Sequence, residues 1–249
     1  MITKNTVKLI QSLKQQKYRN EHQLFVVEGR KMVEELLRSS FETCHLLATE
    51  RFNDEHPLND PRLELVSETQ MAQMSGQTTP PGLLATAKIP ERNLTSLHDT
   101  PLTLALDGIA NPGNMGTIIR TAEWFGVNDI VCSDDCVEFW NPKVIQATMG
   151  SIFRMNLVST DLKAYVQHLQ QQGKAVYGAL LEGENLFGMG RWEDGVLVIG
   201  SESHGIRESI LPLITHPVTI PRAAGSVTES LNASMAAGIL LSHWRQQNK

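Results

Sequence analysis

The sequence predicts an α/β fold in two parts, a smaller α/β domain over residues 1–95 and a larger domain with a mainly parallel sheet over residues 100–249. In the second part, short apolar runs rich in β-branched residues alternate with helical patterns, which is typical of strands buried on both faces of a sheet. Between the parts, residues 90–101 lose the apolar pattern and carry a proline at each end, which indicates a linker. A chain of 249 residues is long enough to bury two modest cores.

The N-terminal part begins its regular pattern with a short apolar run at residues 24–27, which predicts a strand. The spacing of apolar residues over 30–38 then predicts a helix, and further strands are expected at 44–48 and 63–66. Residues 75–82 are rich in Gly, Thr and Pro, so this stretch is expected to form a loop.

The C-terminal part contains the alternating pattern. Strands are expected at residues 102–106, 129–132, 175–181, 196–199 and 218–220. Helices are expected at residues 116–125, 161–172 and 229–245. Because ligands of parallel α/β sheets bind beyond the carboxyl ends of the strands, the loops that follow these strands are the expected place for a site.

Composition limits the class of protein. The net charge of -5 argues mildly against a nucleic-acid partner, since phosphate binding usually requires an excess of Lys and Arg. Residues 4–38, however, hold eight Lys and Arg against four Glu, and this stretch is either a solvated helix face or a patch that contacts RNA. The three cysteines lack metal-ligand spacing, which indicates reduced thiols and no metal site. The lack of a long apolar run and of a secretory signal predicts a cytoplasmic protein without a membrane partner.

A first segment with chemical potential follows the strand at 102–106. Asn111-Pro-Gly-Asn114 predicts a turn whose polar side chains cap the next helix. On that helix Arg120 is expected to point away from the core, where a guanidinium can grip a phosphate or an activated hydroxyl. A surface salt bridge is the ordinary alternative for a single arginine, and the presence of Asn114 six residues earlier favours the functional interpretation.

Two more segments lie at strand ends. In Gly200-Ser-Glu-Ser-His-Gly205 the glycines allow close approach of the backbone to a ligand, although a tight turn alone would also use them. We expect Glu202 to anchor this loop by accepting backbone amides rather than to transfer a proton, and we expect His204 to be a bystander. In the third segment, Ile220-Pro221 ends a strand, and Ser230-Leu-Asn232 is expected to begin a helix rich in small residues.

In this order, the three segments resemble the three motifs of the SpoU family of RNA 2'-O-ribose methyltransferases. Asn114 and Arg120 match the first motif, and the remaining matches are Gly200, Glu202 and Gly205 in the second and Ile220, Pro221, Ser230, Leu231 and Asn232 in the third. Residues 25–29 and 79–84 are similar to the ribosomal-protein-like substrate-binding domain of the family, so the resemblance covers essentially the whole chain.

The resemblance implies a C-terminal domain with a deep trefoil knot, a homodimer packed through that domain, and methyl transfer from S-adenosylmethionine to a ribose 2'-hydroxyl without a metal. The cofactor would be held by backbone groups around Leu180, Gly200, Ile220 and Leu231. The catalytic set would be Arg120, Asn114, Glu202, Ser230 and Asn232. Arg120 would act directly on the 2'-hydroxyl, either as a base or by stabilising the developing alkoxide, with the amides and Ser230 orienting it and the RNA phosphate.

The chain departs from the family pattern between Pro221 and Ser230, where residues 222–229 are longer than the usual spacing and Arg222 stands where an apolar residue is common. If the extra residues bulge outward, the cofactor contacts that flank them at Ile220 and Leu231 should survive, and Gly225 is expected to supply the turn.

The RNA substrate and the class of protein leave alternatives. The N-terminal domain and the lack of a basic C-terminal tail favour large-subunit (23S) ribosomal RNA over transfer RNA. A catalytically inactive, ribosome-associated RNA-binding protein is a second alternative. A nucleotide-dependent oxidoreductase is disfavoured because no GxGxxG fingerprint follows the first strand of the sheet.

Overall fold

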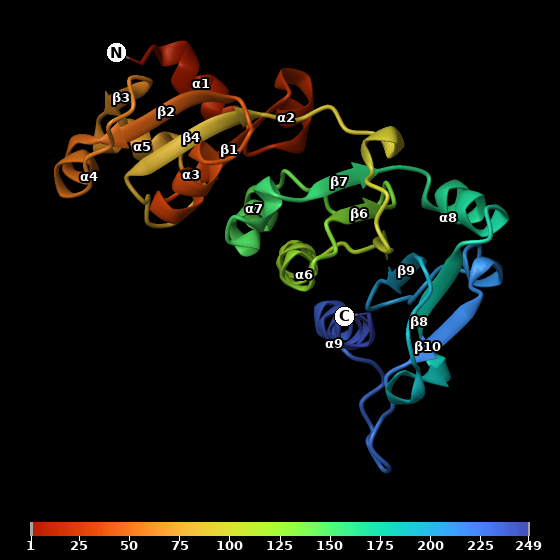
Figure 1. Ribbon diagram of the computed structural model, residues 1–249. Helices are drawn as coiled ribbons and strands as arrows, with labels where there is room; N and C mark the ends of the chain where they lie inside the picture. Colours follow the sequence, from red (N-terminus) through yellow and green to blue (C-terminus); the bar gives the residue numbers. More distant parts are fainter. Residues whose placement is uncertain (1, 249) are drawn as a thin grey trace. The chain divides into compact units, whose positions relative to one another are not determined.

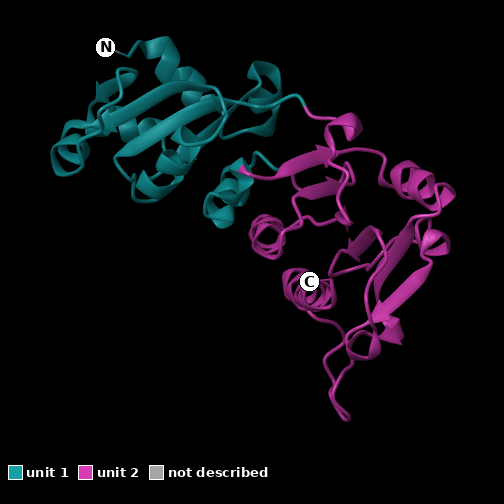
Figure 2. Cartoon of the chain, viewed as in Figure 1, with its two compact units in different colours: residues 1–91, 138–153 teal, residues 92–137, 154–249 magenta. Residues whose placement is uncertain are grey.

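The computed structural model describes residues 2–248, and the chain forms two compact units (Figures 1 and 2). Unit 1 comprises residues 1–91 and 138–153, and unit 2 comprises residues 92–137 and 154–249. The chain therefore leaves the first unit, builds part of the second, and returns to the first for one short segment before completing the second.

Unit 1 has a four-stranded sheet with the order β1-β4-β2-β3, formed by β1 (Leu24–Glu28), β4 (Leu83–Lys88), β2 (Thr43–Thr49) and β3 (Leu63–Val66). β4 is antiparallel to both of its neighbours, and β2 and β3 are parallel. The helices of this unit are α1 (Lys4–Ser12), α2 (Gln16–His22), α3 (Arg30–Leu37), α4 (Glu50–Glu55), α5 (Glu68–Met74) and α7 (Pro142–Thr148), with a short 3-10 helix η2 (Ser151–Phe153). The core between α1, α5 and the sheet includes Val7, Ile10, Val26, Leu47 and Met71.

Residues 138–153 complete unit 1 through aromatic and charged side chains. The Trp140 ring lies 4.7 Å from the Phe25 ring, centroid to centroid, and Phe153 lies 5.5 Å from Phe41. The Arg19 guanidinium is buried, forms an ion pair with Glu138, and donates a hydrogen bond to the Leu13 carbonyl. Burial without full compensation lowers the pKa of Arg19. Arg19 thus serves the core of unit 1 and is not part of the basic surface of residues 4–38.

Unit 2 has a six-stranded, fully parallel sheet with the order β10-β8-β9-β5-β6-β7. Its strands are β5 (Leu102–Asp107), β6 (Asp129–Cys132), β7 (Asn156–Ser159), β8 (Ala175–Asn185), β9 (Gly195–Gly200) and β10 (His216–Thr219). Its helices are α6 (Pro112–Phe125), α8 (Leu162–Gln171) and α9 (Ala233–Gln247), with 3-10 helices η1 (Leu94–Ser96), η3 (Leu186–Gly188) and η4 (Leu211–Leu213). α6 and α9 pack together on one face of the sheet, and α8 covers the other face (Figure 1).

All five strands predicted for the C-terminal part are present, and so are the predicted N-terminal strands and the loop at residues 75–82. Two strands were not predicted, β4 and β7. The prediction for the last helix was wrong at its start, because α9 begins at Ala233 and not at Glu229. Ser230 and Leu231 therefore lie in the preceding loop, and Asn232 is the residue that caps the helix.

The loop between β10 and α9 extends away from the rest of unit 2 (Figure 1). Gly225 has φ of +80° at its turn, and Arg222 Nη1 donates to the Thr228 carbonyl at 3.0 Å. Val227 near the tip is 92% exposed. The loop therefore bulges outward (Figure 1), and the turn expected at Gly225 is present. Among residues 2–248, no helix is both long and apolar enough to cross a bilayer.

Candidate active site

The loops that carry the first and second motifs start side by side. Asp107 at the end of β5 pairs in register with Gly200 at the end of β9. After β5, the Asn111 side chain caps α6 by accepting hydrogen bonds from the backbone N–H groups of Gly113 (2.8 Å) and Asn114 (3.2 Å). Pro112 occupies the first turn, where its fixed φ suits a helix start and its missing N–H costs nothing. The sheet and the cap together place Asn114 at the carboxyl edge, as the sequence predicts.

Asn114 joins all three motifs. Its side-chain amide donates to Glu202 Oε1, and its amide oxygen accepts a hydrogen bond from Asn232 Nδ2 at 3.0 Å. Asn232 also caps α9, because its Oδ1 accepts from the backbone N–H groups of Ser234 and Met235. Three residues separated by 88 and 118 positions in sequence thus form one continuous hydrogen-bonded chain.

Glu202 is held differently from the expectation. It accepts a side-chain amide from Asn114 rather than backbone amides, and its loop is closed by its own backbone. Ser201 and Gly205 exchange two backbone hydrogen bonds of 3.1 and 2.9 Å. His204 is exposed and its Nδ1 lies 2.8 Å from the neighbouring Ser203 hydroxyl, so nothing orients it toward Asn114.

Arg120 lies in the third turn of α6, further into the helix than the N-terminal turn expected from the sequence. Its side chain is exposed and, within residues 2–248, forms neither a hydrogen bond nor an ion pair. The alternative of a surface salt bridge therefore does not describe it. Ser230 is also exposed, and neither residue is hydrogen-bonded to the Asn114 chain among the residues that the structure describes. A guanidinium without a protein partner remains available for an anion such as a phosphate.

The four residues assigned to cofactor binding lie on or after the strands at one side of the sheet. Leu180 on β8 is half-buried against the core under α8, and Ile220 directly follows β10. Thr219 Oγ1 donates to the Leu181 carbonyl at 3.0 Å, which fastens these two segments together. Leu231 is 47% exposed, so its apolar side chain lacks full cover by the protein.

Gly200 requires the absence of a side chain. A Cβ atom at this position would lie 2.0 Å from the Gly205 carbonyl carbon and 2.2 Å from the Ile206 nitrogen, both in the backbone. Real Cβ atoms do not approach so closely, so only glycine allows the loop after β9 to fold back on the strand end. The site thus offers backbone, apolar side chains and amides, which fits a ligand that is both aromatic and polar.

Two further charged residues at this edge, Asp107 and Arg207, bind each other and were not predicted from the sequence. A usable signal existed for Asp107, since it ends an otherwise apolar strand. Among residues 2–248, no group of three or more His, Cys, Asp or Glu side chains is arranged to hold a metal ion. All three cysteines are free thiols.

The parallel sheet and its polar cluster at the strand ends define an α/β protein of the ligand-binding, enzymatic type. The chain belongs to the SpoU rRNA methylase family, whose model matches residues 101–242. Residues 4–85 match the MRM3-like substrate binding domain. The fold class predicted from the sequence, a parallel-sheet domain after a smaller α/β domain, is confirmed.

Individual relatives agree with this assignment. The chain is 30% identical over 241 residues to the 23S rRNA (guanosine(2553)-2'-O)-methyltransferase RlmP of Bacillus subtilis, covering 96% of this chain and 95% of that protein. An RNA methyltransferase of the TrmH family from Porphyromonas gingivalis has a similar structure, with a TM-score of 0.89, 35% identity and full coverage of both chains. The AdoMet-bound rRNA methyltransferase from Sinorhizobium meliloti has a TM-score of 0.86 at 25% identity, covering 99% of this chain and 96% of that one.

Proposed function

We propose that this protein transfers the methyl group of S-adenosylmethionine to a ribose 2'-hydroxyl in large-subunit (23S) ribosomal RNA. The observation that carries the proposal is the hydrogen-bonded chain of Glu202, Asn114 and Asn232, one residue from each of the three motifs. Family membership and the relation to RlmP over nearly the full length of both proteins support the reaction and the substrate.

S-adenosylmethionine, when bound, supplies a methyl group on a sulfonium, which is electrophilic enough to react without a metal. The protein then has to align the sugar oxygen with the methyl carbon and stabilise the negative charge that develops on that oxygen as its proton passes to solvent water. In the proposed assignment Arg120 faces that oxygen or the adjacent phosphate, because it is the exposed arginine of the first motif and has no partner among residues 2–248. A guanidinium keeps its proton at neutral pH, so stabilisation of the alkoxide is favoured over general-base catalysis.

The other residues have supporting roles in this proposal. Asn114 is hydrogen-bonded to both Glu202 and Asn232 and so holds the loops after the strands together. Ser230 is exposed in the loop before α9, where it would contact the RNA. The backbone near Leu180, Gly200, Ile220 and Leu231 would hold the cofactor, with the Leu231 side chain covering its apolar part.

The two domains are proposed to divide the work, with residues 1–95 binding the RNA and residues 100–249 carrying the reaction. The match of residues 4–85 to a substrate-binding domain supports the first role. The segment that runs from edge strand β10 to α9, next to α6, is proposed to thread a deep trefoil knot, as in the family. A cytoplasmic location stays a prediction.

Comparison of ribose methylation in total RNA from cells with and without the gene tests the function. We expect one 2'-O-methyl group in large-subunit ribosomal RNA to be present only with the gene. A missing methyl group in transfer RNA instead would contradict the substrate, and unchanged methylation together with no binding of S-adenosylmethionine to the purified protein would favour the inactive RNA-binding alternative.

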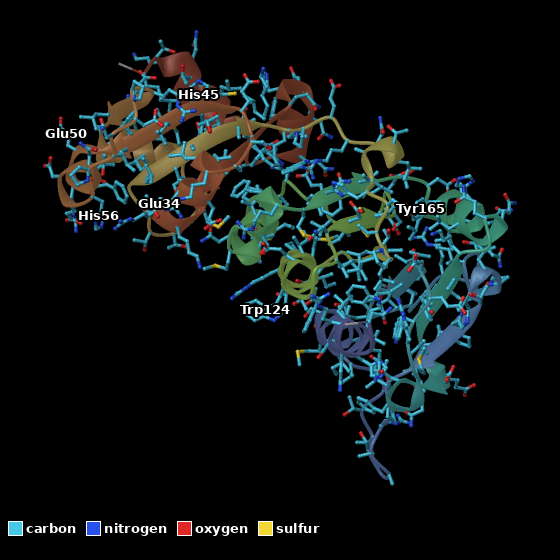
Figure 3. All side chains as sticks on the ribbon, viewed as in Figure 1. Glu34, His45, Glu50, His56, Trp124 and Tyr165 are labelled. Atoms are coloured by element: carbon cyan, nitrogen blue, oxygen red, sulfur yellow. The ribbon has the colours of Figure 1, made fainter. Side chains whose placement is uncertain are left out.

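A homodimer through unit 2 is also proposed. The outer face of α6 and α9 has a hollow of about 470 Å³, lined by Phe125, Phe187, Gly238, Ile239, Ser242, His243 and Gln246. Next to it Met235 is 60% exposed, and Trp124, 83% exposed, projects outward from α6 (Figure 3). Exposed apolar side chains on two adjacent helices are more stable when a second copy of the chain covers them than when water does.

The substitution Met235→Asp tests this interface. Because Met235 is exposed, the change should leave the fold of one chain intact, but burying a carboxylate in a dimer would cost about 2 kcal/mol or more. We expect light scattering after size exclusion to give twice the chain mass for the wild type and a shift toward the single-chain mass for Met235→Asp. Val227→Asp, at an exposed apolar residue in the loop, is the control and should stay dimeric. A wild-type protein with the mass of one chain would contradict the proposal.

A further inference from the structure

Arg207 connects three strand ends in unit 2. Its Nε donates to Asp107 Oδ1 at 2.5 Å, and its backbone N–H donates to the other oxygen of the same carboxylate at 2.8 Å. Its Nη2 donates to both oxygens of Asp135, at 2.8 and 3.1 Å, and to the Ser133 hydroxyl at 3.3 Å. Asp107 ends β5, Ser133 and Asp135 follow β6, and Arg207 follows β9, so one side chain ties together the loops after three parallel strands.

The partners of Arg207 are themselves fixed. Asp107 is only 2% exposed, so its carboxylate depends on Arg207 for compensation of its charge. Ser133 donates to Asp135 Oδ1 at 2.6 Å and accepts from the Gly108 N–H at 3.0 Å, which fastens the turn after β6 to the turn after β5. The Ser133 hydrogen bond, with Arg207 beside it, lowers the pKa of Asp135, and the bond to Asp135 raises the pKa of Arg207. Both groups are therefore charged near neutral pH.

This clamp lies directly beside the loop that presents Glu202. Arg207 lies two residues after Gly205, and the Ser201–Gly205 turn is closed by two backbone hydrogen bonds and by a bond from the His204 N–H to Ser201 Oγ at 3.2 Å. Glu202 at its tip is exposed and makes its contact across to α6 through Asn114. Ile206 packs into the core that contains Ala105 of β5, but among residues 201–207 only Arg207 forms side-chain hydrogen bonds to the end of β5.

We propose that Arg207 is a positioning residue of the methyl-transfer reaction, which acts through Asp107 and Asp135 to hold the Gly200–Gly205 loop where Glu202 meets Asn114. The inference rests on the proposed function for its kinetic consequence. Its structural part, the fixing of the loop, stands on the contacts of Arg207 alone. Arginine is required because its planar fork reaches two carboxylates in different directions, which the single ammonium of lysine cannot do.

Arg207→Ala and Arg207→Lys in the full-length protein test the proposal. With RNA and S-adenosylmethionine both saturating, we expect the single-turnover rate to fall by at least about tenfold in Arg207→Ala, since small misplacements at an active site have effects of this size or larger. Arg207→Lys keeps a positive charge beside Asp107 and should fold as the wild type does, but it should recover only part of the rate. Hydrogen exchange of the peptide covering residues 199–207 should become faster by at least about tenfold in Arg207→Ala.

Arg154→Ala is the matched control. Arg154 pairs with Glu123 and its side chain is 48% exposed, close to the 43% of Arg207, but it precedes β7 and so lies at the amino edge of the sheet. Its loss should change neither the rate nor the exchange of residues 199–207.

A second test combines Arg207→Ala with Glu202→Gln. If Arg207 acts through Glu202, its rate effect should shrink in the Glu202→Gln background.

The outcomes separate the two proposals. A rate for Arg207→Ala within about twofold of Arg154→Ala, or an undiminished effect in the Glu202→Gln background, would overturn the positioning role. If the wild type transfers no methyl group to any RNA, the proposed function fails, and the exchange measurement still decides whether Arg207 fixes the loop. Unchanged exchange in Arg207→Ala would overturn that as well.

Discussion

Arg120→Ala is expected to lower the rate of methyl transfer by about a hundredfold to a thousandfold while leaving the affinity for S-adenosylmethionine nearly unchanged. The expected loss is large because a guanidinium that binds a developing oxyanion contributes most in the transition state, when the charge forms. The affinity should persist because Arg120 is exposed on α6 and, within residues 2–248, forms no hydrogen bond or ion pair with the residues assigned to the cofactor. Single-turnover kinetics would give the rate, and calorimetric titration of the cofactor would give the affinity.

Arg191→Ala is the control for this prediction, since Arg191 is another exposed arginine of unit 2 that no described residue pairs with. Arg120→Lys adds a finer comparison, because it keeps the charge but loses the fork that binds a phosphate or oxyanion with two donors. Full activity in Arg120→Ala would remove Arg120 from the reaction. A parallel loss of cofactor affinity would instead assign it to cofactor binding.

The arrangement of unit 2 could be predicted largely because its strands carry local signals. The run at residues 102–106 is mainly apolar and buried, and buried apolar runs also occur in the first half of β8 and in β9. β7 escaped prediction because its four residues begin with the polar Asn156, which is buried with its side-chain amide donating to Asp129 and to the Ser96 carbonyl. A buried polar residue in a short strand looks like a loop residue until its distant partner is known.

The return of residues 138–153 to unit 1 has no local signal either. Trp140 and Phe153 are apolar and could be buried in either unit. Their contacts with Phe25 and Phe41 place them in unit 1. The start of α9 failed for a different reason. Asn232 is a strong cap that accepts two backbone N–H groups, and it overrides the helical pattern that continues back to Glu229.

The candidate site, like the fold, could be predicted from the sequence only in part. Each motif could be placed at a strand end from the sequence, because Gly200 and Asn111 follow apolar runs. That Asn114 contacts both Glu202 and Asn232 follows from the order of the strands, which local periodicity does not contain, and only the resemblance to a family grouped them. Arg207 was missed because its importance comes from Asp107, a residue 100 positions earlier in the chain.

Gly200→Ala is expected to have the second large effect, on cofactor binding. The added methyl group would lie 2.0 to 2.3 Å from three backbone atoms of Gly205 and Ile206, and backbone cannot move aside as a flexible side chain can. Overpacking of this kind costs about 1–3 kcal/mol, which corresponds to about fivefold to 150-fold in affinity if the strain is relieved by displacing the loop. We expect a weakening at the upper end of that range, together with loss of methyl transfer.

Gly190→Ala is the matched control, because an added Cβ there meets no atom within 4 Å and its backbone is not in the left-handed region. Circular dichroism should show similar folded spectra for both variants, since the β9 core residues before Gly200 stay buried. If Gly200→Ala binds S-adenosylmethionine as tightly as Gly190→Ala does, the loop after β9 does not form part of the cofactor site. A weakened affinity with an intact fold would instead support a cofactor site that depends on the close approach of Gly205 and Ile206 to the end of β9.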